Sequence, residues 1–214
     1  MITNERILAE IKARKQKTLE IIEATELPEE LKPVLEQFHG QNVDELVSLM
    51  AKELLPNFSF EEYGEVQYMG FEWYYDGRSF PEALGYFGES CEPAPDASHL
   101  PVGSDTHEAR EDFEVGSELS GVLCGDCGYI DVNLVYGPLY NVLCEEGDNH
   151  VELEGDEAPD LLENLYTLRL YEIVHLAMQK LEASENMVKK NMKTPFYLFL
   201  NNHDWSPFLV YAMG

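Results

Sequence analysis

The acidic residues of this chain are concentrated in its middle, which limits both how it can fold and what it can bind. Between Glu53 and Leu168 there are 27 Asp and Glu residues and two basic ones, Arg78 and Arg110, a net charge of −25. Residues 1–52 and 169–214 carry −3 and +1, and the whole chain carries −27. Aromatic and aliphatic residues are interleaved with the acids, so the stretch can still form a core. A folded surface of this charge repels nucleic acid and anionic membranes and attracts basic proteins or cations.

Length and composition indicate a globular protein. With 214 residues, 44% hydrophobic and 11% aromatic, the chain can bury a core without staples. We expect one α+β domain over residues 1–214, with a helical part at 1–56 and an acidic sheet-and-helix part at 57–214. The chain contains no apolar run of about 20 residues and no signal core at its start, which predicts a cytoplasmic protein with reduced cysteines.

Helical periodicity marks the N-terminal part of the chain. Apolar residues recur at helical spacing over 4–26, where Thr3 or Asn4 can cap the start. A short helix is predicted over 28–40, and a third opens at Asn42 or Asp44 and ends at Pro56. A basic cluster at 12–17 is flanked by acids and is interpreted as a solvated helix face.

From residue 58 the pattern changes to that of strands. Alternation predicts a strand over 65–75, followed by a long loop at 76–118. Three short apolar runs, at 119–124, 129–136 and 139–144, are separated by Gly and Pro and predict an antiparallel meander. A long helix from Pro159 to Met187 should pack on the sheet, and strands are expected at 196–200 and 208–213. The predicted fold is α+β with a central antiparallel sheet.

The most site-like motif is C-G-D-C at residues 124–127. A C-x-x-C turn can supply two of the four ligands of a structural zinc, and Cys144 with His150, or Cys91 with His99, would have to supply the others. A redox pair belongs at a helix start, whereas a strand is expected here. We favour a hairpin turn flanked by half-buried thiols, and therefore expect no cofactor. The zinc alternative would use Cys124, Cys127, Cys144 and His150.

No motif in the chain selects a reaction. Seven carboxylates between 145 and 157 lack calcium-loop spacing, because the sixth position counted from Asp148 is Leu153 and not glycine. His175 lies in the apolar long helix and is predicted to be a core histidine with a satisfied hydrogen bond. His203 and Asp204 are neighbours in a turn and are not expected to face each other as an acid–base pair. We predict no catalytic residue.

Three segments in order resemble the SUKH superfamily, which includes yeast cell-wall regulators and bacterial immunity proteins. Residues 27–40 (LPEELKPVLEQFHG) are similar to the opening helix motif of that family. Residues 100–105 (LPVGSD) are similar to the segment that enters a central strand, and residues 121–144 to the strand pair that follows. The resemblance implies an α+β fold that binds a protein and performs no reaction.

Charge and resemblance together predict a non-enzymatic immunity or inhibitor protein that occludes a basic partner such as a nuclease toxin. Alternatives are a zinc-binding domain or metal-dependent enzyme, a nucleic-acid mimic, and acidity that serves solubility only. We expect no binding of nucleic acid or membrane, and the sequence does not set the oligomeric state. The predicted partner-binding residues are exposed aromatic anchors and nearby carboxylates: Trp73, Tyr74, Tyr75, Phe87, Glu108, Glu111, Asp112, Glu145, Glu146 and Asp148.

Overall fold

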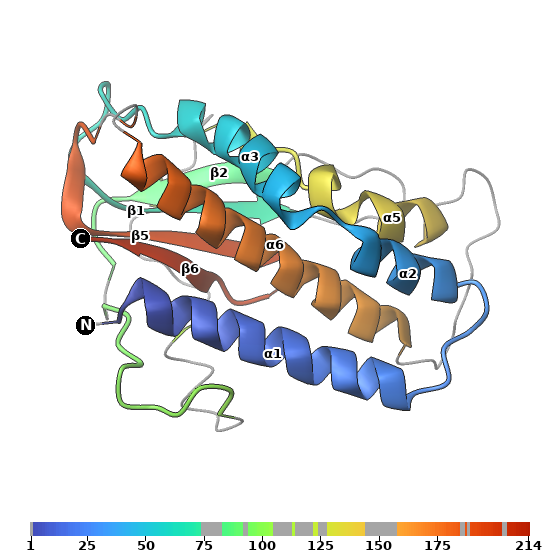
Figure 1. Cartoon of the computed structure of the whole chain (residues 1–214). Coiled ribbons are helices and arrows are strands. Elements are labelled where there is room, and N and C mark those ends of the chain that lie inside the picture. Colours follow the sequence, from blue (N-terminus) through green and yellow to red (C-terminus); the bar gives the residue numbers. More distant parts are fainter. Residues whose placement is uncertain are drawn as a thin grey trace.

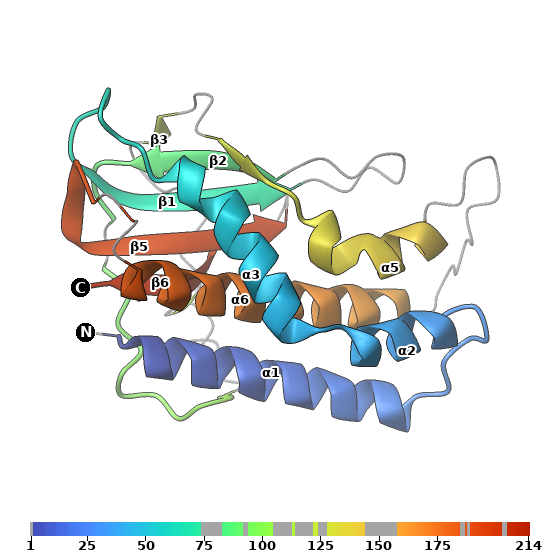
Figure 2. The same cartoon turned by 45° about the horizontal axis from the view of Figure 1, so that its top comes forward.

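The structure is a computed structural model of the whole chain, and it confirms the α+β class. It describes residues 2–73, 83–91, 94–104, 113, 122–123, 128–143, 158–184, 187, 189–202 and 205–214. A layer of helices covers one face of a twisted sheet, with the long helix α6 (Ala158–Ala183) in the middle of that layer (Figures 1 and 2). As predicted, this long helix packs on the sheet, where Tyr171 stacks on Phe208 at 4.9 Å between ring centroids.

The three N-terminal helices begin and end where the sequence indicates. α1 (Asn4–Ala24) is capped by Thr3, whose hydroxyl accepts a hydrogen bond from the Arg6 amide. α2 (Lys32–Gly40) carries a proline in its first turn, and α3 (Val43–Leu54) is capped by the side chain of Asn42. A 3-10 turn (Leu55–Asn57) then stops α3 at the predicted proline.

The sheet is mixed, so the prediction of an antiparallel sheet is wrong for its central pair. The strands are β1 (Val66–Trp73), β2 (Ala83–Gly88), β3 (Val122–Leu123), β4 (Tyr129–Ile130), β5 (Met192–Asn202) and β6 (Phe208–Met213). Their order is β3-β2-β1-β5-β6, with β4 also paired to β2. β1 and β5 are parallel, and all other pairs are antiparallel. Parallel pairing needs a long crossover, which the residues between β1 and β5, including α6, provide.

Two further predictions are corrected. The region 76–118 was expected to be a loop, but β2 lies within it. The runs 129–136 and 139–144 were expected to be strands, but the helix α5 (Asn133–Leu143) spans most of both. Asp131 accepts a hydrogen bond from the Asn133 amide at 2.9 Å and starts this helix. Short apolar runs fit a buried helix as well as a strand, and packing against α6 decides between them.

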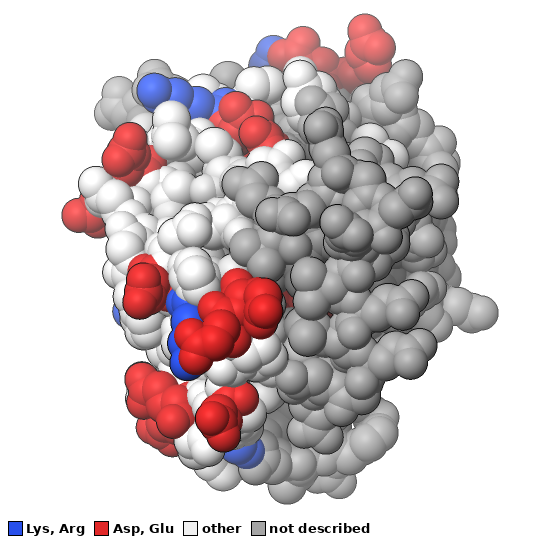
Figure 3. Space-filling model, turned by 90° about the vertical axis from the view of Figure 1, so that its right-hand side faces the viewer, with Lys and Arg blue, Asp and Glu red and all other residues white. Residues whose placement is uncertain are grey.

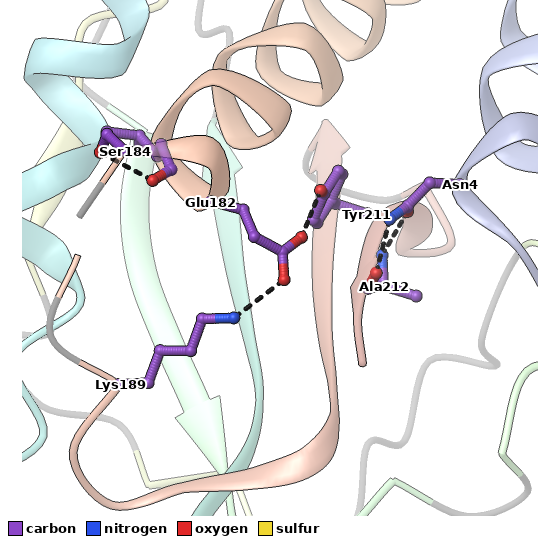
Figure 4. A network of polar contacts seen from close by, with 7 residues as sticks. Asn4, Glu182, Ser184, Lys189, Tyr211 and Ala212 are labelled. Atoms are coloured by element: carbon purple, nitrogen blue, oxygen red, sulfur yellow. Dashed lines mark hydrogen bonds and ion pairs between the residues drawn. The ribbon is translucent and has the colours of Figure 1, made fainter. Parts of the chain in front are cut away.

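A polar contact protects the exposed edge of the sheet at β6. The side-chain amide of Asn4 donates to the Ala212 carbonyl at 2.7 Å and accepts from the Ala212 amide at 2.9 Å. Nearby, Glu182 accepts hydrogen bonds from the Tyr211 hydroxyl and the Lys189 ammonium, which ties the end of α6 to β6 (Figure 4). Asn4 thus takes the place that the backbone of another strand would fill at an open edge.

Candidate interaction surface

One end of the molecule carries exposed acidic side chains with little compensating positive charge. The second half of α1, the connection to α2 and α2 itself contain six exposed glutamates against two exposed lysines, Lys17 and Lys32. Asp160, in the first turn of α6, is exposed at the same end. Figure 3 looks onto this end, where acidic side chains form several patches on the described surface and basic side chains lie beside some of them. We call this surface the acidic end, and it consists of Glu20, Glu23, Glu26, Glu29, Glu30, Glu36 and Asp160.

The acidic end was not evident when charge was counted by sequence segments. Residues 1–52 are nearly neutral overall, because basic residues up to Lys17 offset the later glutamates. In the structure these two groups separate along the axis of α1, and the glutamates lie at its C-terminal end (Figure 1). The described ends of α5 and α6 that flank residues 144–157 lie at this same end of the molecule (Figure 1). Sequence reasoning placed the acidic surface in residues 53–168 alone, and thereby missed these glutamates.

An open groove of about 1400 Å³ runs between α1 and α6 beside the acidic end. It is lined by residues of α1 between 13 and 21, by residues of α6 between 160 and 171, and by residues 103–104 and 205–208. Trp205 borders the groove with 42% of its surface exposed. Its amide donates to the Asn202 carbonyl at 3.0 Å, which fixes the turn between β5 and β6.

Polar side chains connect α6, which lines the groove, to its neighbours. The hydroxyls of Thr167 and Tyr136 are hydrogen-bonded between α6 and α5, and burial raises the pKa of Tyr136 well above its ordinary value. At the carboxyl end of β5, the side-chain amide of Asn202 donates a hydrogen bond to the carboxylate of Glu163 at 2.6 Å. Burial raises the pKa of Glu163, and this hydrogen bond opposes the shift. These contacts connect α6, which lines the groove, to α5 and β5.

Internal carboxylates hold the basic side chains of α1 next to the groove. Arg14 donates to the buried carboxylate of Glu10 at 2.9 Å, and its guanidinium lies 5.2 Å from the centre of the Phe208 ring. The other oxygen of Glu10 accepts the Gly103 amide at 2.7 Å. Lys15 pairs with the buried Glu172 of α6. Much of the positive charge of α1 is therefore used inside the fold.

The two predicted aromatic anchors that the structure describes are both buried, so they cannot contact a partner. Trp73 and Phe87 are each 1% exposed. Trp73 packs against Tyr136 and Tyr171 beneath the helices, and Phe87 packs against Phe60. β1 is a central strand whose side chains are buried on both faces of the sheet. The alternation of apolar and polar residues along this strand therefore does not indicate which side chains are exposed. The other predicted contacts lie outside the described residues: Tyr74, Tyr75, Glu108, Glu111, Asp112, Glu145, Glu146 and Asp148.

The zinc alternative is untested, because Cys124, Cys127, Cys144 and His150 also lie outside the described residues. Within the described part of the chain, no group of three or more His, Cys, Asp or Glu side chains could hold a metal ion. Cys91 is buried, and burial raises the pKa of its thiol to about 11, which leaves it an unreactive thiol. His175 is fully buried and its Nδ1 is hydrogen-bonded to the Val210 carbonyl at 2.7 Å, which confirms it as a core histidine.

Exposed apolar side chains mark two places that sequence reasoning missed. Trp205 lies in the turn between β5 and β6, two residues before Pro207, and its side chain is exposed. The sequence Trp-Ser-Pro, which is typical of a turn, was the only indication of this exposure. Leu84 and Tyr129 are directly opposite each other on β2 and β4, with 66% and 51% of their surfaces exposed. The exposed aromatic side chains Trp205, Tyr129 and Tyr63 are the described alternatives to Trp73 and Phe87 as anchors.

Comparison with protein-family models, curated proteins and solved structures gives no match. Among the described residues, none of the helices combines the length and apolar character that a membrane span requires. The function therefore has to be argued from the acidic end and the groove themselves.

Proposed function

We propose that this protein is a non-enzymatic binding module that neutralises a basic protein partner in the cytoplasm by covering its functional surface. The observation that carries the proposal is the acidic end, where six exposed glutamates and Asp160 outnumber two exposed lysines, Lys17 and Lys32. Opposite charge on a partner would accelerate association, and the effect would weaken as salt shortens the screening length to about 8 Å. The resemblance of three segments to the SUKH superfamily supports a partner of the nuclease-toxin class.

Three features of the described structure support binding over solubility as the role of this charge. Seven exposed acids lie at one end with only two exposed lysines, whereas charge that serves solubility is best interspersed with the opposite sign. A groove opens beside them, and an exposed tryptophan borders it. Trp and Tyr are the residue types that most often carry interface energy.

The test compares two variants of equal net charge. One carries Glu20→Gln, Glu23→Gln and Glu26→Gln at the acidic end. The control carries Glu61→Gln, Glu62→Gln and Glu65→Gln, which are also exposed but lie in the segment that enters β1 at the opposite end. Both changes reduce the net charge from −27 to −24.

Binding of both variants to a panel of inactivated basic nucleases would be measured at low and high salt. We expect the acidic-end variant to lose about tenfold in affinity at low salt, since each exposed charge contact contributes up to about 1 kcal/mol. The control should lose less than about twofold. Equal losses in the two variants would show that bulk charge is responsible, and the absence of binding by the wild type would refute the proposal.

A further inference from the structure

The groove between α1 and α6 has the chemistry of a site for a basic peptide segment. It opens onto the acidic end, because Glu20 and Asp160 belong both to that surface and to the groove lining. The lining also contains apolar groups, Ile21 and Leu161, with Ile21 43% exposed. The groove therefore combines carboxylates with apolar contact area, which a stretch of charged surface alone would not provide.

The basic residues in the groove do not cancel this preference. The guanidinium of Arg14 is paired with Glu10 and lies over Phe208, so its charge is balanced from inside the fold. Lys17 is then the one other basic residue among the described lining residues, against the carboxylates of Glu20 and Asp160. When the neighbouring glutamates of the acidic end are included, carboxylates outnumber basic side chains around the groove.

Trp205 determines which cation fits best. An exposed indole attracts a cation over its face, and a planar guanidinium can stack on it while donating hydrogen bonds to a carboxylate. An ammonium group is a compact, strongly hydrated charge and gains less from stacking. An aromatic face and carboxylates in one groove are thus suited to arginine in preference to lysine.

We propose that this groove holds an arginine-bearing extended segment of the partner, with an arginine side chain stacked on Trp205 and its charge balanced by Asp160 and Glu20. This inference rests on the proposed function and specifies where the partner is anchored. It predicts a preference for arginine that the acidic end alone would not produce, because exposed glutamates attract lysine and arginine about equally.

The probe is a short labelled peptide of alternating arginine and alanine, with lysine and glutamate versions as comparisons. The chain has two tryptophans, Trp73 and Trp205, so its NMR spectrum contains two indole signals that a Trp205→Phe variant assigns. We expect the arginine peptide to shift the indole signal of Trp205 and to leave that of Trp73 unchanged. The lysine peptide should bind several-fold more weakly, and the glutamate peptide should not bind.

Single substitutions distinguish the groove proposal from the proposed function. Trp205→Ala should weaken binding of the arginine peptide by about five- to tenfold, and Asp160→Asn should weaken it to a smaller extent. Tyr129→Ala is the matched control, because Tyr129 is also an exposed aromatic residue but does not line the groove. Thermal unfolding checks that each variant is folded.

The outcomes are distinct. If the arginine peptide binds and the acidic-end variant weakens it, but Trp205→Ala leaves its affinity unchanged, the groove proposal is wrong and the proposed function stands. Equal affinities for the arginine and lysine peptides, or binding of the glutamate peptide, would also overturn the groove proposal. If neither the basic peptides nor the basic nucleases bind the wild type, both proposals fail.

Discussion

The contact between Gly70 and Tyr86 allows a sharp test of the sheet. These residues are directly opposite each other on β1 and β2. The ring of Tyr86 lies across Gly70, and its hydroxyl donates to Asn201 on β5 at 2.9 Å, so one side chain ties three strands together. A Cβ atom added at Gly70 would stand 2.1 Å from Cζ of Tyr86. The ring therefore has to leave its position in a Gly70→Ala variant.

Two costs follow from that displacement. Forcing extra volume into a packed site costs about 1–3 kcal/mol. Loss of the hydrogen bond leaves the side-chain oxygen of Asn201, which is 4% exposed, without its donor, and that costs about 1–3 kcal/mol more. We expect Gly70→Ala to lower the free energy of unfolding by about 3 kcal/mol, measured by urea denaturation with an unchanged m-value.

The matched control is Gly40→Ala at the end of α2, where no heavy atom other than those of the chain neighbours and the helix backbone lies within 4 Å of the added Cβ. Alanine in place of glycine in a helix should raise stability by up to about 1 kcal/mol, so the two substitutions are expected to have opposite signs. In a Tyr86→Ala background, Gly70→Ala should lose most of its cost. A cost below about 1 kcal/mol, or an equal cost in both backgrounds, would refute the reasoning.

Three further results are expected. Asn4→Ala removes both hydrogen bonds to Ala212, so the Ala212 amide should exchange with solvent faster by hydrogen-exchange NMR; unchanged exchange would mean that Asn4 does not protect the edge. Lys15→Met leaves the buried carboxylate of Glu172 without its closest cation and should cost about 2 kcal/mol in urea unfolding, a loss that Glu172→Leu in the same chain should partly restore. Burial lowers the pKa of His175, so between that pKa and about 6.5 the unfolded chain binds more protons and stability should fall as the pH is lowered; the slope should be smaller in His175→Gln.

The helices were predictable because their signals are local. The capping side chains Thr3 and Asn42 act within one turn of the backbone, and the apolar spacing in α1, α3 and α6 reflects one buried side of each helix. α5 was missed because its tyrosine and valine residues are equally typical of strands. Its helical state depends on packing against α6, which the sequence of residues 133–143 does not contain.

The parallel pairing of β1 and β5 was missed for a related reason. Residues far apart in the sequence form this pair, and no turn sequence connects them directly. The burial of Trp73 follows from this pairing, because β1 has a neighbouring strand on each side and both of its faces are covered. The acidic charge was visible in the sequence, but its grouping at one end depends on how α1, α2 and α6 are arranged.

The glutamates at the end of α1 also contradict a local rule of helix stability. The C-terminal end of a helix carries partial negative charge, so acids there are unfavourable by about 0.3–1 kcal/mol each at low salt. Glu23 lies in the last turn of α1 and Glu20 three residues earlier, and that turn contains no basic residue. Their neutralisation should therefore stabilise the protein while it weakens binding of a basic partner. Some residues lower stability at positions where other residues would be more favourable. Such residues are expected at functional sites. A gain in melting temperature together with a loss of affinity in the Glu20→Gln, Glu23→Gln variant would fit that account, whereas a loss of both would mean that these glutamates contribute to the fold.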